Sequence, residues 1–179
     1  MSTSPRPHAL LTKFFPLAVA VAGVFVWVSG QSLPPMMASH FGASGQADVF
    51  MPREAYRLLM TGVTVGVPLL VVYVPNWLIR AMPGAVNLPH RNYWLAPERQ
   101  AATLDALRRM SFGFGWLLLG FLAYVQWLVL RANTADPPAL PLTWLVGGLL
   151  LFVCGNLFLT FLLFRRFGRV PGAPRTDGR

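Results

Sequence analysis

The chain has 179 residues, of which 55% are hydrophobic and only 12% are charged. A soluble domain normally carries about 25% charged residues, so this composition excludes an ordinary water-soluble fold. The formal net charge of +9 comes mainly from arginines beside long apolar runs. That distribution excludes nucleic acid as the partner and favours the lipid bilayer with its anionic headgroups.

Four apolar runs are long enough to cross a bilayer as helices, because a hydrocarbon core of about 30 Å needs about 20 helical residues. None has Asp, Glu, Lys, Arg or His in its interior. We therefore expect an all-α membrane protein whose four transmembrane helices form a bundle. That single domain covers residues 1–165, and a basic cytoplasmic tail covers 166–179. The expected spans are about residues 14–30, 59–80, 112–131 and 142–164.

The first run has two interpretations. Arg6, Lys13 and the small residues after Val28 are also typical of a cleaved secretory signal peptide. The length of the run and Trp27 at its far edge favour retention as a membrane helix, since tryptophan prefers the headgroup layer.

Basic residues are distributed unequally between the two expected sides of the membrane. One side holds Arg53, Arg57 and Arg131, and all the other arginines and Lys13 fall on the opposite side. The positive-inside rule places the richer side, with both termini, in the cytoplasm. The preference for arginine over lysine suggests a GC-rich bacterial genome, so we expect a bacterial inner membrane.

Small residues predict where the helices approach one another, because lipid gives no reward for packing large apolar side chains together. The pairs at helical spacing are Ala18 with Ala22, Gly113 with Gly120, and Gly148 with Gly155. We also expect Pro68 and Pro75 to kink the second span. Gln126 and Asn156 are expected to form hydrogen bonds between helices.

The segment 31–57 follows the first span and contains the candidate ligand-binding residues. They are His40, Phe41, Gly42, Gly45 and Asp48. The glycines permit a tight turn with positive φ, and Asp48 can form a hydrogen bond within that turn. Residues 52–54 are expected to begin the helix of the second span.

The order Leu33-Pro34, His40-Phe41-Gly42, Gly45, Asp48 resembles the short N-terminal domain of unknown function in SdpI-like bacteriocin-immunity membrane proteins. The resemblance covers about residues 14–80, and Val49 stands where the family usually has glycine. The family's second signature region is absent from the remainder of the chain. The expected orientation places segment 31–57 outside the cytoplasm, and we call it the outer segment. The resemblance implies an immunity or toxin-sensing role for this outer segment.

The same segment also contains residues that could form a metal site. Met36, Met37, His40 and Met51 are ligand types that suit Cu(I). The favoured interpretation is that the methionines enter the membrane interface while His40 forms a hydrogen bond to the turn, because adjacent methionines do not easily share one ligand face. We therefore expect no metal and no cofactor.

The segment 80–111 contains a second candidate contact surface, formed by His90, Arg91, Asn92, Tyr93 and Trp94. Its aromatic residues favour contact with lipid headgroups, and a docking surface for a cytoplasmic partner is the alternative. Residues 97–109 are expected to form a short amphipathic interfacial helix, with Glu98 in its first turn.

No catalytic constellation is present in the sequence: there is no nucleophile–base pair, no pair of neighbouring carboxylates and no phosphate-binding glycine loop. We therefore expect a protein without catalytic activity that senses or binds through its outer segment. The alternative is a small accessory subunit of a larger membrane complex. A transporter is less expected, since ionisable groups are missing inside the spans.

Overall fold

The computed structural model describes residues 7–171, with side chains for 10–84 and 86–171. Within these residues, four helices are long and apolar enough to span a membrane. They are α1 (Pro7–Ser29), α2 (Arg53–Ala81), α4 (Pro97–Ala132) and α5 (Leu142–Phe167). The prediction of four apolar helices is confirmed, and α2 begins where the sequence placed its first turn. Part of the expected tail, residues 172–179, lies outside the described residues.

The helix α4 extends well beyond the expected third span. Its 36 residues correspond to about 54 Å at about 1.5 Å per residue. A hydrocarbon core is only about 30 Å thick. The expected short helix of residues 97–109 is thus not a separate element, because it continues into the span without interruption. Similarly, α2 remains one helix through both Pro68 and Pro75.

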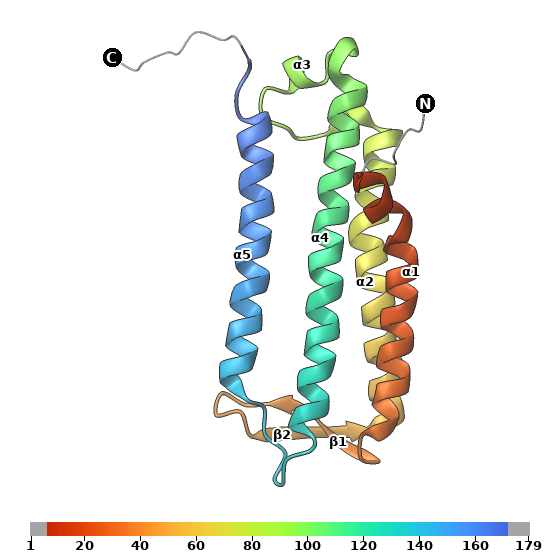
Figure 1. The fold of residues 1–179 in the computed structure, drawn as a ribbon, viewed down its shortest axis with the longest axis vertical. Helices are drawn as coiled ribbons and strands as arrows, with labels where there is room; N and C mark the ends of the chain where they lie inside the picture. The colour runs from red at the N-terminus through yellow and green to blue at the C-terminus, as the bar shows by residue number, and fades with distance from the viewer. Residues whose placement is uncertain (1–6, 172–179) are drawn as a thin grey trace, which may run out of the picture.

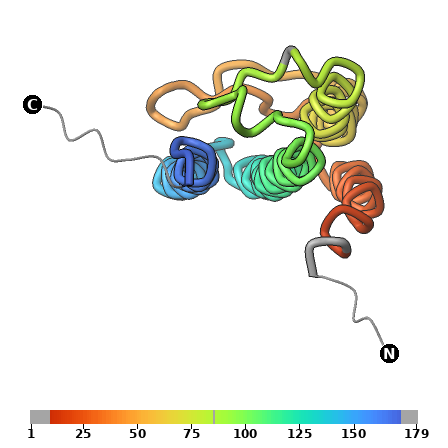
Figure 2. The backbone as a smooth tube through the Cα atoms, turned by 90° about the horizontal axis from the view of Figure 1, so that it is seen from above, coloured from red at the N-terminus to blue at the C-terminus, as the bar shows by residue number. Residues whose placement is uncertain are grey.

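Three of the long helices pack against one another, and the fourth lies to one side (Figures 1 and 2). The main contacts join α1, α2 and α4, whereas α5 packs mainly on α4. This differs from the closed four-helix arrangement expected from the sequence. The buried core accordingly lies between α1, α2 and α4, around Phe15, Val19, Val72, Phe112 and Leu119.

Glycines set the close approach of α5 to α4. A Cβ atom added at Gly148 would lie 2.1 Å from the Tyr124 ring. A Cβ at Gly113 would lie 3.2 Å from Leu159, and one at Gly155 would lie 3.2 Å from Leu117. The prediction of close packing is confirmed at these three glycines. It is wrong at Gly120, where a Cβ would meet nothing within 4 Å.

The segment between α1 and α2 forms a two-stranded antiparallel hairpin, β1 (Met36–Phe41) and β2 (Ala47–Pro52). The expectation of an all-α fold is wrong here. The hairpin lies across the ends of the long helices, at the opposite end of the molecule from α3 (Arg91–Trp94) (Figure 1). We call these the hairpin end and the arginine-rich end. The arginines of the latter are Arg80, Arg91, Arg99, Arg108, Arg109, Arg165, Arg166 and Arg169.

Candidate functional site

The turn of the hairpin gathers the residues that the sequence singled out. Gly42 N donates to Gln46 O at 2.9 Å, and Gly45 N donates to Gly42 O at 2.9 Å. Gly45 has φ +83°, a left-handed conformation that other residues adopt at a cost. The predicted positive-φ glycine turn is therefore confirmed. Phe41 is half-buried beside it and pairs with Ala47.

A hydrogen bond between His40 and Asp48 links the two strands next to this turn. His40 Nδ1 lies 2.6 Å from Asp48 Oδ1, and the two side chains are 66% and 50% exposed. The register shifts between Ala38 and His40, so His40 pairs with Val49. The pair therefore joins side chains across an irregular part of the ladder. Its exposed donor and acceptor atoms are accessible to a ligand.

The connection between α4 and α5 supports the turn from beside it. Leu140 N donates to Gly45 O at 2.7 Å, and Ala47 N donates to Pro138 O at 3.2 Å. A Cβ atom at Gly45 would lie 2.7 Å from Leu140 O. The turn therefore requires glycine both for its backbone conformation and for this close contact.

The strand β1 is held in turn by a side chain from the end of α4. Ala38 N donates to Asn133 Oδ1 at 2.7 Å, and Asn133 Nδ2 donates to Ala38 O at 3.0 Å. A single amide group thus satisfies both backbone groups of Ala38, as a neighbouring strand would.

Two arginines connect the start of α2 to the end of α1. Arg57 Nε donates to Trp27 O at 3.1 Å, its guanidinium lies 4.1 Å from the Trp27 ring, and Nη1 contacts Glu54 at 2.7 Å. Arg53 Nη1 donates to the carbonyls of Gln31 and Leu33. These carbonyls belong to the last turn of α1 or follow it, so the arginines satisfy polar groups there. Arg57 is nearly buried in doing so.

A buried hydrogen-bonded chain crosses the helices beneath the hairpin. Tyr56 Oη donates to Gln126 Oε1 at 2.7 Å, and Gln126 Nε2 donates to Ser29 Oγ at 3.0 Å. The predicted interhelical bond of Gln126 is confirmed. Asn156 instead bonds Phe152 O within its own helix at 2.7 Å. The sequence did not predict the hydrogen bond of Tyr56, because a tyrosine at the start of a span is usually one that lies in the membrane interface.

The three methionines considered as copper ligands are not all together, because Met37 pairs with Met51 across the hairpin while Met36 lies apart from them. Met37 is fully buried against Leu33 and Tyr56, whereas Met36 is exposed. Among the described residues, no group of three or more His, Cys, Asp or Glu side chains is placed to hold a metal ion. The hydrogen bond expected between His40 and the turn goes instead to Asp48 of β2, beside the turn.

The second candidate surface fastens the end of α5 to α3. His90 Nε2 donates to Gly168 O at 3.1 Å, and Trp94 Nε1 donates to Phe167 O at 2.9 Å. The Trp94 and Phe167 rings meet edge to face, with centroids 5.2 Å apart. No pattern in the sequence connects these residues with α5.

The other three residues of that surface differ in their exposure, since Tyr93 is partly buried while Arg91 and Asn92 are exposed. Arg99 stacks on the Tyr93 ring at 4.0 Å and donates to Tyr93 O at 2.8 Å. Arg91 and Asn92 are exposed and line a small cavity beside Gly84. The five residues therefore divide into two that hold α5, one, Tyr93, that packs against Trp94 and Arg99, and two that remain available for contacts outside the chain.

Comparisons of the chain with protein-family models, with curated proteins and with solved structures find no match. The resemblance seen in segment 14–80 remains a prediction.

Proposed function

We infer that the chain is a multi-pass protein of the bacterial inner membrane that binds a ligand outside the cytoplasm through its hairpin, without catalysing a reaction. Its arginine-rich end lies in the cytoplasm and its hairpin end lies on the outer side. The unequal distribution of arginines between the two ends supports this orientation, because positively charged loops are retained on the cytoplasmic side.

The observation that carries the proposal is that the hairpin is held in place at several points and is nevertheless exposed. Asn133 holds β1, and Leu140 holds the turn. The His40–Asp48 pair remains exposed, as do Val49 at 52% and Phe50 at 49%. A surface that is already ordered loses little conformational entropy on binding, so such a hairpin suits recognition.

The ligand that fits this surface combines polar groups with an apolar part. His40 and Asp48 provide a donor and an acceptor, and the exposed Val49 and Phe50, which follow Asp48 in β2, provide apolar surface. A peptide or small protein that reaches the membrane from outside has both kinds of group. An immunity-like role, in which a toxin is recognised there, agrees with the resemblance of segment 14–80.

Photo-crosslinking from the hairpin tests the proposal. A photoreactive phenylalanine analogue replaces Phe50, and a matched control replaces Leu157, which is 62% exposed on α5. We expect a discrete adduct in whole cells from position 50 and none from position 157, with loss of the adduct in His40→Ala. An adduct that survives both His40→Ala and Asp48→Asn would contradict recognition by this pair.

The orientation is tested separately by cysteine accessibility. After Cys154→Ala, single cysteines are placed at Ser44 in the turn and at Gln100 near the start of α4. In intact spheroplasts, a membrane-impermeant maleimide should label position 44 only, and position 100 should react after lysis. Labelling of position 100 before lysis would reverse the orientation.

A second function is supported by α5. Its main contacts are with α4, and large apolar side chains such as Leu151 and Phe158 are exposed along it. In a membrane these faces are covered by lipid or by another subunit, and the latter would make the chain an accessory subunit. Native mass spectrometry of the protein in mild detergent, extracted from its own membrane, separates the two. A stoichiometric partner chain favours the accessory subunit, and a bare chain favours the hairpin receptor.

A further inference from the structure

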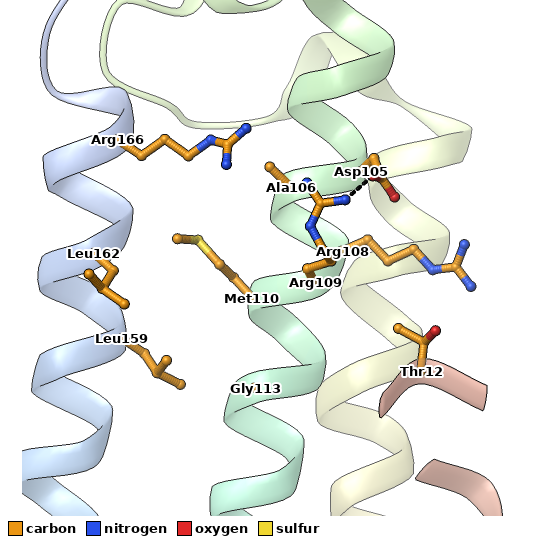
Figure 3. A pocket seen from close by; sticks show the side chains of 10 residues that line it. All are labelled: Thr12, Asp105, Ala106, Arg108, Arg109, Met110, Gly113, Leu159, Leu162 and Arg166. Carbon is orange, nitrogen blue, oxygen red and sulfur yellow. Dashed lines mark hydrogen bonds and ion pairs between the residues drawn. The ribbon is translucent and has the colours of Figure 1, made fainter. Parts of the chain in front are cut away.

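A groove opens between α4 and α5 at the arginine-rich end, with a volume of about 680 Å³. It exists because α5 packs mainly on α4 and no other long helix fills the space beside that contact. Thr12 on α1 forms its far edge (Figure 3). The clamp of His90 and Trp94 on the end of α5 holds the two walls in position.

The groove is basic at one end and apolar below it. Arg108 and Arg109 on α4 and Arg166 on α5 line the basic end, and Arg166 extends from α5 towards α4 (Figure 3). The apolar part is lined by Met110, Gly113, Leu159 and Leu162. This order matches the two parts of a phospholipid, a charged headgroup above an acyl chain.

The charges in the groove are only partly neutralised. Among the described residues, Asp105 is the one acidic residue lining it, and its carboxylate is paired with Arg109. Arg108 and Arg166 contact the faces of Phe112 and Phe167. Within the described part of the chain, these two guanidiniums form no hydrogen bond or ion pair. Three positive charges against one negative charge leave the groove with a net charge of +2, which a bound anion can offset.

The apolar wall continues along the same faces of both helices. On α4, Gly120 follows Gly113 by seven residues, and on α5, Leu151 precedes Leu159 by eight. Gly120 and Leu151 line a further apolar cavity of about 430 Å³. The eleven helical steps from Arg109 to Gly120 span about 16 Å at about 1.5 Å each. That length is close to one leaflet, half of a hydrocarbon core of about 30 Å.

We propose that this groove binds one anionic phospholipid, with its phosphate at the guanidinium of Arg166, beside the Arg109–Asp105 pair, and one acyl chain along Leu159 and Leu162. Guanidinium groups suit phosphate because their N–H donors match pairs of its oxygens. The net positive charge selects an anionic headgroup over a zwitterionic one, whose ammonium group would meet the same arginines. The proposal is independent of what the hairpin binds.

Native mass spectrometry of the full chain released from nanodiscs tests this site. The nanodiscs contain phosphatidylglycerol and phosphatidylethanolamine in equal amounts. We expect the wild-type chain to retain one phosphatidylglycerol preferentially. Arg166→Gln should retain about fivefold less, since one arginine near an anionic surface contributes about that factor. Arg165→Gln is the matched control, because it removes the same charge from the neighbouring residue, which does not line the groove.

Two further variants distinguish a specific lipid-binding site from nonspecific electrostatic attraction of anionic lipid. Arg166→Lys keeps the charge but loses the paired donors, so retention should fall below that of the wild type. Leu162→Trp fills the apolar part without changing charge and should also lower retention. These two variants carry the test if Arg166→Gln does not fold, as judged by thermal unfolding in detergent.

Several results would overturn the proposal. An equal loss of retained phosphatidylglycerol in Arg165→Gln and Arg166→Gln would show that the lipid is attracted by the overall positive charge and not by this groove. Equal retention of the two lipids would remove the selection by charge. If inorganic phosphate alone protected the chain against thermal unfolding as well as phosphatidylglycerol does, the groove would be a site for phosphate and not for a lipid.

Discussion

The side-chain amide of Asn133 forms hydrogen bonds with both the N–H and the C=O of Ala38, 95 residues earlier in the chain. Because Asn133 directly follows α4, this pairing ties the hairpin to the helix that also contacts α1, α2 and α5. The position of the candidate ligand-binding surface therefore depends on the helical part of the protein.

Replacing Asn133 by aspartate should loosen the hairpin. The carboxylate still accepts from Ala38 N, but it has no donor for Ala38 O and repels that carbonyl. We expect a loss of about 1–3 kcal/mol of local stability, the range for an unsatisfied buried polar group. Hydrogen–deuterium exchange should become faster across residues 36–52. Thr134→Ala, at the next residue, is the control and should leave this exchange unchanged.

Replacing Gly45 by alanine should destabilise the turn. The residue has φ +83°, and the added Cβ would lie 2.7 Å from the backbone oxygen of Leu140. A left-handed conformation costs a non-glycine residue about 1–2 kcal/mol, and the contact with the carbonyl adds to this. Thermal unfolding in detergent should begin at a lower temperature. Gly66→Ala in α2, where a Cβ meets nothing within 4 Å, should not lower it.

The packing of α4 against α5 should be disturbed by an alanine at position 148 and not by an alanine at position 147. A Cβ at Gly148 would clash with the Tyr124 ring, whose hydroxyl donates to Trp144 O at 2.6 Å, while a Cβ at Gly147 would meet nothing within 4 Å. Gly148→Ala should therefore displace the ring and lower thermal stability. Equal unfolding temperatures for Gly148→Ala and Gly147→Ala would show that the helices are not packed this closely.

The Tyr56–Gln126 bond should appear as a coupling between two substitutions. Gln126→Leu leaves the buried Tyr56 hydroxyl without its acceptor, at a cost of about 1–3 kcal/mol. Adding Tyr56→Phe removes the hydroxyl as well, so the double variant should recover part of that loss. A double-mutant cycle on the free energy of unfolding measures the coupling, for which membrane helices give about 0.6 kcal/mol on average.

The four helices could be located from the sequence because each span satisfies the requirements of the bilayer, its thickness and internal backbone hydrogen bonding, without help from other segments. About 20 apolar residues without a charge satisfy the length of the bilayer, and a helix bonds its own backbone. The same local reasoning identified the turn, since Gly42 and Gly45 mark it whatever surrounds them. Its left-handed Gly45 agrees with the structure, whereas Asp48 forms its bond with His40 across the strands beside the turn.

The strands beside that turn were missed because their support comes from distant residues. A two-stranded hairpin is at best marginally stable by itself. Here Asn133, Pro138 and Leu140 supply the missing bonds, from beyond two further long helices. The flanking Phe41, Val49 and Phe50 favour strands and were the available signal.

The packing of α5 also depended on the tertiary structure. Gly113 and Gly120 have the same spacing as Gly148 and Gly155, yet Gly120 meets open space while the other three meet side chains of the neighbouring helix. Apolar side chains gain little by leaving lipid for one another, so a pattern of small residues identifies faces that permit close approach without selecting the partner. That choice comes from contacts such as Tyr124 with Trp144 and Trp94 with Phe167, which join segments far apart in the chain.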